Sequence, residues 1–524
     1  MDFLIHHMPQ RSAVRSPDKE ALVHAGERLT YAEVAGRMAG LARGLRQAGI
    51  ERGDRVGIYL DPSVPQVLSI FAVSQASGVF VPLNPLLFPE QIVHIARDCR
   101  IKGLITTGSK LRALTGVLER LEALEFVVVV DDGPVPEVGL PSYDFAALCG
   151  SDLASQLHDV AIEKDLAAIL YTSGSTGRPK GVMLSHAQIM AGASIVSTYL
   201  DITAADRILA VLPFSFDAGM NQLMTAFQQG GTLILTTFVF ARDIVQKLAS
   251  ERVTALAGVP TLWTLLSQPS SSLHKTAVPH LRYITNTGGA MPQTVLATLR
   301  RILPGTRIFL MYGLTEAFRS TYLPPEELDR RPTSMGRAIP DTEILVVSED
   351  GTRCKPGEVG ELVHRGPTVS MGYWGQPELT AKVLRPHPFL APELGSDEKV
   401  CYSGDLVTMD DDGFLYFVGR RDTLIKSSGF RISPTEVEEV LFQTGGVREA
   451  AVIGIPDDVL GQAIKAFVVL ADGHAPTPEG LLEFCTTKMP HYMVPKAIVI
   501  VDALPKTSSG KIDYPAIRRE QGLS

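Results

Sequence analysis

Residues 171–181, with the sequence Tyr-Thr-Ser-Gly-Ser-Thr-Gly-Arg-Pro-Lys-Gly, combine the groups that bind phosphate. They follow an apolar run at 166–170 that is typical of a buried strand, and a helix pattern opens near His186. Backbone N–H groups between a strand end and a helix can hold an anion, and glycines let the backbone approach it closely. The Ser and Thr hydroxyls add donors, and Lys180 adds a positive charge. The stretch therefore predicts a triphosphate-binding loop.

Two alternatives explain this stretch less well. A P-loop nucleotide-binding motif needs Gly, four residues and then Gly-Lys-Ser or Gly-Lys-Thr. Here Pro179 precedes Lys180 and Gly181 follows it, so the spacing fails. A flexible linker would not need a Lys after a Pro, nor so many small donors directly after a buried strand. The stretch is therefore interpreted as a phosphate-binding loop of another kind.

Residues 311–316, Met-Tyr-Gly-Leu-Thr-Glu, close a second strand with an aromatic ring, a hydroxyl and a carboxylate. Open α/β sheets bind their ligands at such strand ends. Tyr312 is suited to stack on an adenine, Thr315 to donate to a phosphate, and Glu316 to hold a Mg²⁺ ion that bridges phosphates. The alternative is an ordinary turn after a core strand, and the presence of the phosphate loop disfavours it.

The length and the pattern of elements indicate more than one domain. With 524 residues, the chain exceeds one ordinary core. Thr30 and Glu33 form a capping-box pattern, and strand-like runs then alternate with helical ones, which favours a layered, mostly parallel α/β fold. The expected strands are 55–60, 79–81, 104–106, 126–130, 166–170, 207–212, 232–235, 253–257, 281–285 and 307–311.

The pattern changes in the last third of the chain. From about Asp341, short strands and turns such as 410–413 predict a β-rich subdomain. After the Gly-Arg-Arg-Asp sequence at 419–422, a compact α+β pattern follows, with strands at 450–453 and 466–470. We therefore expect a large N-terminal domain of layered α/β subdomains plus a β-rich subdomain over 1–421, and a small α+β C-terminal domain over 422–524.

The composition is that of a soluble globular protein, with 45% hydrophobic and 20% charged residues. A net charge of -8 argues against a nucleic-acid or anionic-membrane surface, so local loops and lysines would have to hold an anionic cofactor. We find neither a signal-peptide pattern nor a membrane-spanning run. The five scattered cysteines suggest neither a disulfide framework nor a metal cluster. The expected location is the cytoplasm.

The stretch 171–181 resembles the signature of the adenylate-forming superfamily. This superfamily holds the AMP-forming acyl-CoA and aryl-CoA synthetases, the adenylation domains of nonribosomal peptide synthetases, and the luciferases. Residues 311–322 look most like AMP-forming acyl-CoA ligases, including those associated with exosortase systems, and the resemblance runs from about Ser16 to Lys511. It implies ATP-dependent activation of a carboxylic acid to an acyl adenylate, with Mg²⁺ present and pyrophosphate released. CoA or the phosphopantetheine of a carrier protein then takes the acyl group as a thioester.

The resemblance assigns roles to the residues at matching positions. Lys511, which alone would pass for a solvated tail residue, matches the lysine of the adenylation step. Thr315 and Glu316 join it as catalytic residues, with Glu316 also the Mg²⁺ ligand. Asp405 matches the ribose site, where a carboxylate can accept from both hydroxyls, and Arg420 adds a second contact. The implied ATP- and AMP-binding residues are Thr172, Ser173, Gly174, Ser175, Thr176, Gly177, Lys180, Gly288, Gly289, Ala290, Tyr312, Gly313, Asp405 and Arg420.

Charge explains why the first half-reaction needs a lysine. A carboxylate that attacks the α-phosphate brings anion onto anion, and an ammonium that bridges both would stabilise the transition state by roughly 3–4 kcal/mol if it behaves like other preorganised donors. The family's small domain rotates between half-reactions about a hinge that Asp422 matches. Lys426, Gly429 and Arg431 match the loop that then swings in, with Gly429 lining the pantetheine tunnel.

The segment 211–219 bears on the acid that is activated. Many fatty acyl-CoA ligases resemble Pro-x-Phe-His here, whereas Asp217 resembles the amino-acid adenylation domains, in which an Asp pairs with the substrate's α-ammonium. A buried Asp needs a cation or several donors, although Asp217 is also a candidate helix N-cap. Arg319 matches a pocket-lining position suited to a second anionic group, and Asn221 adds polarity. Such a pocket favours a small polar acid, plausibly an amino acid.

Other functions are weighed against this one. A medium-chain, long-chain or aryl acid acyl-CoA ligase is the main alternative. A non-catalytic nucleotide-binding relative is disfavoured because Lys511, Glu316 and Asp405 are all present. No carrier domain follows Lys511, so we expect any carrier protein to be a separate chain.

Overall fold

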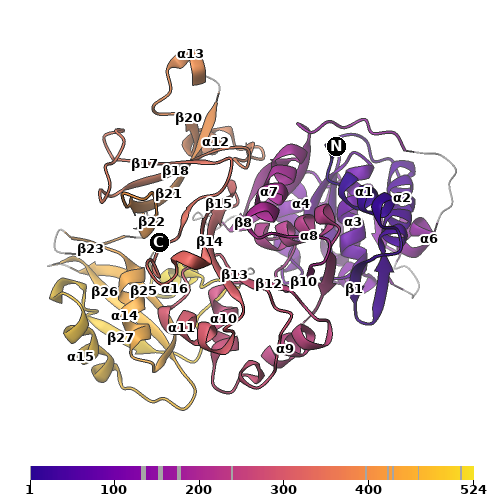
Figure 1. The fold of residues 1–524 in the computed structure, drawn as a ribbon. Helices are drawn as coiled ribbons and strands as arrows, with labels where there is room; N and C mark the ends of the chain where they lie inside the picture. Colours follow the sequence, from indigo (N-terminus) through magenta and orange to yellow (C-terminus); the bar gives the residue numbers. More distant parts are fainter. Residues whose placement is uncertain are drawn as a thin grey trace.

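A computed structural model gives the arrangement of the chain (Figure 1). The N-terminal part (indigo to purple) lies beside the middle of the chain (magenta), the orange strands adjoin the middle of the chain on its other side, and the yellow C-terminal part lies below the orange strands. The described residues are 2–131, 137–150, 157–173, 179–237, 240–395, 398–421, 424–427, 430–457, 460–507 and 510–523.

Eight of the described strands form the first sheet, in the order β19-β9-β8-β4-β3-β5-β6-β7. Its central pairs are parallel, as the alternation of strands and helices predicts, whereas β8 and β9 are antiparallel. The strands are β3 (Arg55–Tyr59), β4 (Val79–Pro82), β5 (Gly103–Thr106), β6 (Phe126–Val129), β7 (Ser142–Asp144), β8 (Leu166–Ser173), β9 (Pro179–Ser185) and β19 (Gly372–Tyr373).

Nine of the described strands form the second sheet, in the order β16-β15-β14-β13-β12-β10-β11-β1-β2. Every strand predicted for the two sheets is present, although several ends shift. The strands are β1 (Glu20–His24), β2 (Glu27–Thr30), β10 (Arg207–Ala210), β11 (Thr232–Leu235), β12 (Ala255–Gly258), β13 (Tyr283–Asn286), β14 (Arg307–Leu314), β15 (Ala317–Leu323) and β16 (Arg337–Ala338).

One apolar core joins strands of both sheets, and four of the described helices supply most of its helical residues. These helices are α2 (Tyr31–Gln47), α3 (Val64–Gln75), α7 (His186–Tyr199) and α8 (Asp217–Gln229). The predicted capping box opens α2, since the Thr30 hydroxyl accepts from the Glu33 backbone N–H and the Glu33 carboxylate accepts from that of Thr30. The other helices of these layers are α1 (His7–Arg15), α4 (Pro89–Asp98), α5 (Gly108–Leu114), α6 (Phe145–Cys149), α9 (Ala241–Ser250), α10 (Pro260–Ser267) and α11 (Gln293–Ile302).

The phosphate loop connects two strands, and the prediction that it connects a strand to a helix is wrong. β8 pairs with β9 in antiparallel register, with Thr172 opposite Lys180, and α7 begins only after β9. The helix start near His186 is confirmed, with Ser185 as its N-cap. The short run after Pro179 becomes a strand because Val182 and Leu184 both face the core. The N-terminus of α7 therefore does not face this loop directly.

The β-rich subdomain predicted from about Asp341 is confirmed. It is the five-stranded sheet drawn in orange in Figure 1, and its predicted turn is present, since the Gly413 N–H donates to the Asp410 carbonyl at 3.0 Å. Its strands are β17 (Glu343–Val347), β18 (Gly360–Arg365), β20 (Leu384–Pro386), β21 (Lys399–Met409) and β22 (Leu415–Arg420), and two short helices, α12 (Pro377–Val383) and α13 (Pro392–Gly395), interrupt them.

The C-terminal part is the predicted α+β unit, with its own apolar core. Its strands are β23 (Ile425–Ser427), β24 (Phe430–Ile432), β25 (Val447–Asp457), β26 (Gly461–Leu470) and β27 (Ala497–Ile500), and its helices are α14 (Pro434–Gln443), α15 (Pro478–Lys488) and α16 (Tyr514–Glu520). The boundary expected at Asp422 lies outside the described residues and stays a prediction.

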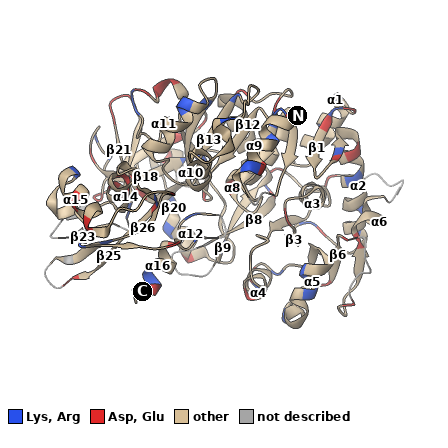
Figure 2. Cartoon of the chain, turned by 90° about the horizontal axis from the view of Figure 1, so that it is seen from below, with Lys and Arg blue, Asp and Glu red and all other residues tan. Residues whose placement is uncertain are grey.

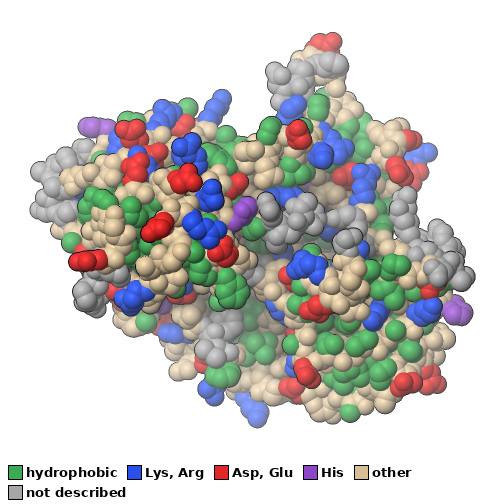
Figure 3. Space-filling view, turned by 180° about the vertical axis from the view of Figure 1, so that it is seen from behind, with side chains coloured by type: hydrophobic (Ala, Val, Ile, Leu, Met, Phe, Trp, Pro, Cys, Tyr) green, Lys and Arg blue, Asp and Glu red, His purple; other side chains and the backbone are tan. Residues whose placement is uncertain are grey.

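The surface mixes charges of both signs. Figures 2 and 3 show Lys and Arg interspersed with Asp and Glu, without a large patch of one sign on the faces in view. Among the described helices, none is long and apolar enough to cross a membrane. All five cysteines are free, and burial raises the pKa of Cys99 and Cys149 to about 12 and that of Cys485 to about 11.

Glu438 is a buried carboxyl group of α14. It accepts a hydrogen bond from the Tyr514 hydroxyl at 2.5 Å and from the Val452 backbone N–H at 2.9 Å. Burial raises its pKa from 4.5 to about 7. A carboxyl group whose pKa is higher in the folded than in the unfolded protein stabilises the fold while it is protonated. This contribution is full below the unfolded pKa and is lost as the pH rises through the folded pKa.

We therefore predict that Glu438→Gln becomes more stable relative to the native chain as the pH rises from 5 to 8, because the amide cannot ionise. Urea unfolding at both pH values measures the gap in unfolding free energy between the variant and the native chain. Glu479→Gln, which changes an exposed residue in the first turn of α15, is the matched control and should leave the gap nearly constant. A constant gap for Glu438→Gln as well would show that Glu438 does not titrate there.

Candidate active site

Three predicted nucleotide-binding side chains meet where β14 approaches the β-rich sheet. The Tyr312 hydroxyl donates to the Asp405 carboxylate, and Arg420 Nε lies 3.1 Å from the other oxygen of that carboxylate. Asp405 and Arg420 are direct neighbours across β21 and β22. Burial and the Asp405 charge raise the pKa of Tyr312 well above its usual value, so the phenol stays protonated and remains a donor. The carboxylate is thus fixed in orientation.

The predicted metal ligand lies in a two-residue turn. Only Thr315 and Glu316 separate β14 from the antiparallel β15. The Tyr373 hydroxyl donates to Glu316 Oε1 at 2.6 Å, and Lys180 Nζ lies 5.8 Å from the centre of the Tyr373 ring. The end of the phosphate loop and the Glu316 carboxylate therefore share one neighbour. An oriented carboxylate beside a phosphate-binding loop fits a Mg²⁺ ion held against phosphates.

Sequence reasoning missed Tyr373. Its signal is the Gly-Tyr-Trp-Gly run at 372–375, which places two aromatic residues between glycines. Tyr373 forms β19 with Gly372 and pairs with Val182 of β9, directly after the phosphate loop. A two-residue strand is too short for its partner to be inferred from the sequence pattern.

Lys511 reaches the N-terminal part of the chain from the C-terminal part. Its Nζ lies 5.1 Å from the centre of the Phe216 ring. Gly288 makes room for it, because a Cβ built on Gly288 would lie 2.9 Å from Lys511 Cε. Gly288 also has a φ of +81°, which favours glycine. The Thr261 hydroxyl donates to the Gly510 carbonyl at 3.5 Å.

The charges around Lys511 come from the predicted site. Burial lowers its pKa, and the negative charges of Asp217, Asp405 and Glu316 act in the opposite direction. The loop before it is tied to itself, since the Thr507 N–H donates to the Lys511 carbonyl at 2.7 Å. Three carboxylates that lie far apart in the sequence thus act on one ammonium, and the positive charge of Arg420 opposes them.

Gly289 and Ala290 line the same region on a short loop after β13. The Asn286 side-chain amide donates to the Gly289 carbonyl at 2.8 Å, which fixes the course of this loop. Both Gly289 and Ala290 are exposed, as a surface that receives a flat ring must be. Gly313 lies against β15, where a Cβ would approach the Arg319 backbone to 3.1 Å.

The three predicted substrate residues lie on α8 and β15. Asp217 is the first residue of α8 and is 5% exposed, and Asn221 follows one turn later at 2%. The N-cap is Phe216, without a side-chain hydrogen bond, so the interpretation of Asp217 as an N-cap is wrong. Arg319 is 4% exposed, and its Nη1 donates to the Thr287 hydroxyl at 3.2 Å.

The remaining predicted residues are described only in part or lie outside the described residues. Thr172 is half-buried in β8, and Lys426 and Arg431 face each other in the pairing of β23 with β24. The remaining members lie outside the described residues, namely Gly174, Ser175, Thr176, Gly177, Asp422 and Gly429, and so do the side chains of Ser173, Lys426 and Arg431.

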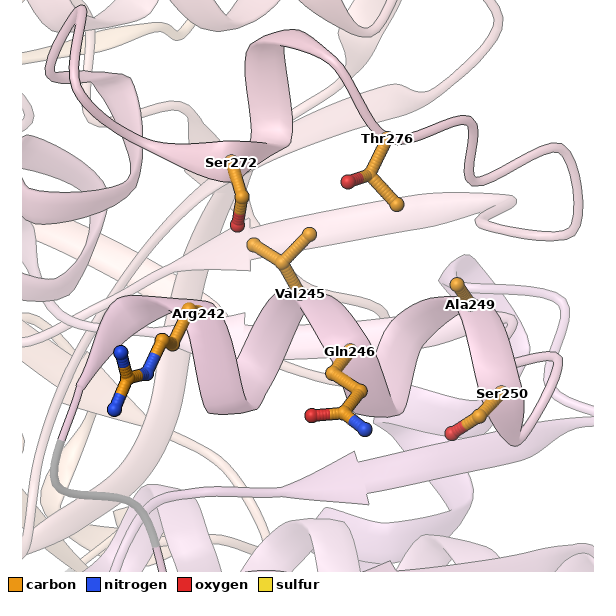
Figure 4. Close-up of a pocket in the computed structure, with 7 residues that line it drawn as sticks. All are labelled: Arg242, Val245, Gln246, Ala249, Ser250, Ser272 and Thr276. Atoms are coloured by element: carbon orange, nitrogen blue, oxygen red, sulfur yellow. The ribbon is translucent and has the colours of Figure 1, made fainter.

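A groove apart from this site lies between α9 and the turn at 272–276 (Figure 4). Arg242, Val245, Gln246, Ala249, Ser250, Ser272 and Thr276 line it, and none of the predicted site residues is among them.

Two histidines and an aspartate also gather near the N-terminus. His6 Nε2 and His7 Nε2 lie 2.9 and 2.8 Å from the two oxygens of Asp159. His7 Nδ1 accepts the Phe3 backbone N–H at 3.3 Å, so a neutral His7 carries its proton on Nε2 and donates it to Asp159. Hydrogen bonds therefore account for this cluster without a metal ion.

Comparison with known proteins places this arrangement in a family. Residues 9–374 match the model of the AMP-binding enzymes, and residues 436–511 match that of the AMP-binding enzyme C-terminal domain. A feruloyl-CoA synthase of Amycolatopsis sp is 35% identical over 98% of both chains. A long-chain-fatty-acid–CoA ligase of Salmonella typhimurium is 31% identical over 98% of this chain and 92% of its own. The crystal structure of an anthranilate CoA ligase in complex with anthranoyl-AMP superposes with a TM-score of 0.89 at 25% identity, over 99% of this chain and 97% of that chain.

The fold and the site define an AMP-forming acid–thiol ligase, with a large N-terminal and a small C-terminal domain. The chain belongs to the AMP-binding enzyme family. Its activity is therefore the adenylation of a carboxylic acid with ATP and the formation of a CoA thioester.

We predict that Tyr312→Phe weakens ATP binding about tenfold to a hundredfold, because a hydrogen bond to a charged group is worth about 1.5–3 kcal/mol and the Asp405 carboxylate loses its orientation. Calorimetric titration with ATP measures the affinity without any acid present. Tyr416→Phe is the matched control, since Tyr416 donates to Asp410 at 3.1 Å, a carboxylate of the turn between β21 and β22. Equal ATP affinities in both variants would contradict the role given to Tyr312.

Proposed function

We propose that this chain is a ligase for a small polar acid, with an amino acid as the leading candidate, and that Lys511 drives its first half-reaction. The observation that carries this proposal is that Lys511, from the C-terminal part, lies over the Phe216 ring and against Gly288, where the charges of Asp217, Asp405 and Glu316 act on it. A buried ammonium next to these groups is suited to hold a substrate carboxylate against the α-phosphate of ATP. In this proposal, the C-terminal part has the orientation that adenylation requires.

The proposed chemistry balances in two steps. In the first, an oxygen of the acid attacks the α-phosphorus, the bond to the β-phosphate breaks, and pyrophosphate leaves with the electron pair. Lys511 stabilises the negative charge that gathers between the reactants. Thr315 donates to a phosphate oxygen, and Tyr373 holds the Glu316 carboxylate in place. Mg²⁺, when bound by Glu316, supplies positive charge on the side of the leaving pyrophosphate.

In the second step, a thiolate attacks the acyl carbon, the bond to AMP breaks, and the thiol proton goes to solvent. The acceptor is CoA or the phosphopantetheine of a separate carrier protein. We assign the thiol contacts to Lys426, Gly429 and Arg431, and the hinge between the two steps to Asp422. The cytoplasm, where ATP and CoA are available, is the proposed location.

The polar side chains of the pocket support the choice of acid. Asp217, Asn221 and Arg319 are each at most 5% exposed, and a long alkyl chain would offer none of them a polar partner. The alternative, an aryl or long-chain acid, is favoured by the names of two relatives, a feruloyl-CoA synthase and a long-chain-fatty-acid–CoA ligase. Pyrophosphate release with ATP and a panel of amino, short, aryl and long-chain acids decides between them.

We predict that Lys511→Ala lowers the rate of pyrophosphate release by a factor of about 10² to 10³, as the loss of a preorganised charge does elsewhere. The same variant should still convert supplied acyl adenylate and thiol to thioester. Lys506→Ala is the matched control, because Lys506 belongs to the same loop but pairs with Glu449. If both half-reactions failed equally in Lys511→Ala, the role of Lys511 would be wrong.

We predict that Asp217→Ala loses the preference for amino acids over the matched acids without an amine, because its carboxylate no longer pairs with the ammonium. The ratio of the two kcat/KM values measures this preference. Asp243→Ala, which removes the carboxylate from the first turn of α9, is the matched control for helix stability. An equal fall in rate for all acids would make Asp217 a counterion of Lys511 instead.

A further inference from the structure

Arg319 is a buried guanidinium without a buried counterion. It is 4% exposed, and its one described hydrogen bond from the side chain goes to the neutral Thr287 hydroxyl. Its Nε is buried without a partner, and no described carboxylate forms an ion pair with it. A charge removed from water is costly unless it is paired, so this arrangement lacks a negative group.

The other buried arginine among the described residues, Arg331, has counterions. Arg331 is 9% exposed and pairs with three carboxylates, those of Glu327, Asp410 and Asp412. Pairing of a buried guanidinium is therefore available to this fold, and the missing partner at Arg319 is specific to its position.

The backbone of Arg319 is strained at the same place. Its φ is +72°, in the left-handed region that residues with a Cβ rarely adopt. Such strain costs on the order of 1–3 kcal/mol and tends to persist at functional sites, where the surroundings hold it. The strained backbone of β15 holds the guanidinium in the interior, where no group among the described residues neutralises it.

A second unpaired donor lies against Phe318, the neighbour of Arg319 in the chain, and aromatic rings lie within reach of the Arg319 charge. Asn221 Nδ2 is also buried without a partner. It lies 3.7 Å from the position of a Cβ on Gly192, a position that Phe318, the neighbour of Arg319, approaches to 2.5 Å. The positive charge of Arg319 reaches Tyr199, whose ring stacks on Tyr322 at 4.3 Å. An unpaired guanidinium N–H close to aromatic rings matches an anionic oxygen ligand.

We propose that the acid activated by this enzyme carries a second carboxylate, which Arg319 binds. This inference rests on the proposed function and makes it more specific. The substrate class is a small dicarboxylic acid, with or without an amine beside the reacting carboxyl group. One carboxylate meets Lys511 and ATP, and the other stays ionised at Arg319 and does not react.

The test compares matched acids that differ only in the second carboxylate: succinate with butyrate, adipate with hexanoate, glutamate with norvaline, and phthalate with benzoate. In the native enzyme, the kcat/KM for pyrophosphate release should be about tenfold to a hundredfold higher for at least one diacid than for its partner, as expected for a charged hydrogen bond. Arg319→Met should remove or reverse this preference, and Arg319→Lys should keep part of it.

A binding measurement separates this inference from the proposed function. The melting temperature with a non-hydrolysable ATP analogue should rise with the preferred diacid in the native enzyme and not in Arg319→Met. Without any ligand, Arg319→Met should be at least as stable as the native chain, because it removes an unpaired buried charge. Arg337→Met, at an exposed arginine of β16, is the matched control.

The outcomes are distinct. Use of monocarboxylic acids as efficiently as diacids, with no effect of Arg319→Met, would overturn the inference and leave the ligase function intact. Pyrophosphate release with none of the acids would count against the proposed function, and the melting temperatures would then decide on Arg319 alone. A diacid that stabilises both proteins equally, or neither, would overturn the inference.

Discussion

The site depends on bringing a positive charge to a place where negative charges must meet. The acid, the phosphates and the carboxylates of Asp217, Asp405 and Glu316 all repel one another at short range, and a low-dielectric site strengthens that repulsion. Lys511 offsets it from the opposite part of the chain, through the space that Gly288 leaves free. In the proposed reaction, this ammonium acts in the first step, where the negative charge gathers.

The N-terminal layers hold the acids in fixed positions. Glu316 lies in a turn between two strands, Asp405 lies in the middle of β21, and Asp217 begins a helix that is buried on nearly all sides. Each carboxylate is therefore carried by an element whose backbone is determined by the core. Tyr312 and Tyr373 then orient two of the three by hydrogen bonds. The three carboxylates therefore come from the N-terminal part of the chain, and the ammonium of Lys511 comes from the C-terminal part.

Much of this could be predicted from the sequence, because alternating apolar runs and motifs are local. The parallel strands, the β-rich subdomain, the capping box at Thr30 and the Tyr312–Glu316 segment were all predictable in this way. β9 was not, since its partner β8 comes before the loop and its apolar pattern is short. Tyr373 and the missing partner of Arg319 depend on contacts between distant segments, which no local pattern encodes.

The cysteines described above have a chemical consequence for an enzyme that hands acyl groups to sulfur. Only a thiolate attacks a thioester or an acyl adenylate, and burial keeps the thiols of Cys99, Cys149 and Cys485 protonated at physiological pH. The enzyme therefore presents its activated intermediate to a foreign thiol while its own sulfur stays inert. It therefore avoids acylating itself with the intermediate that it forms.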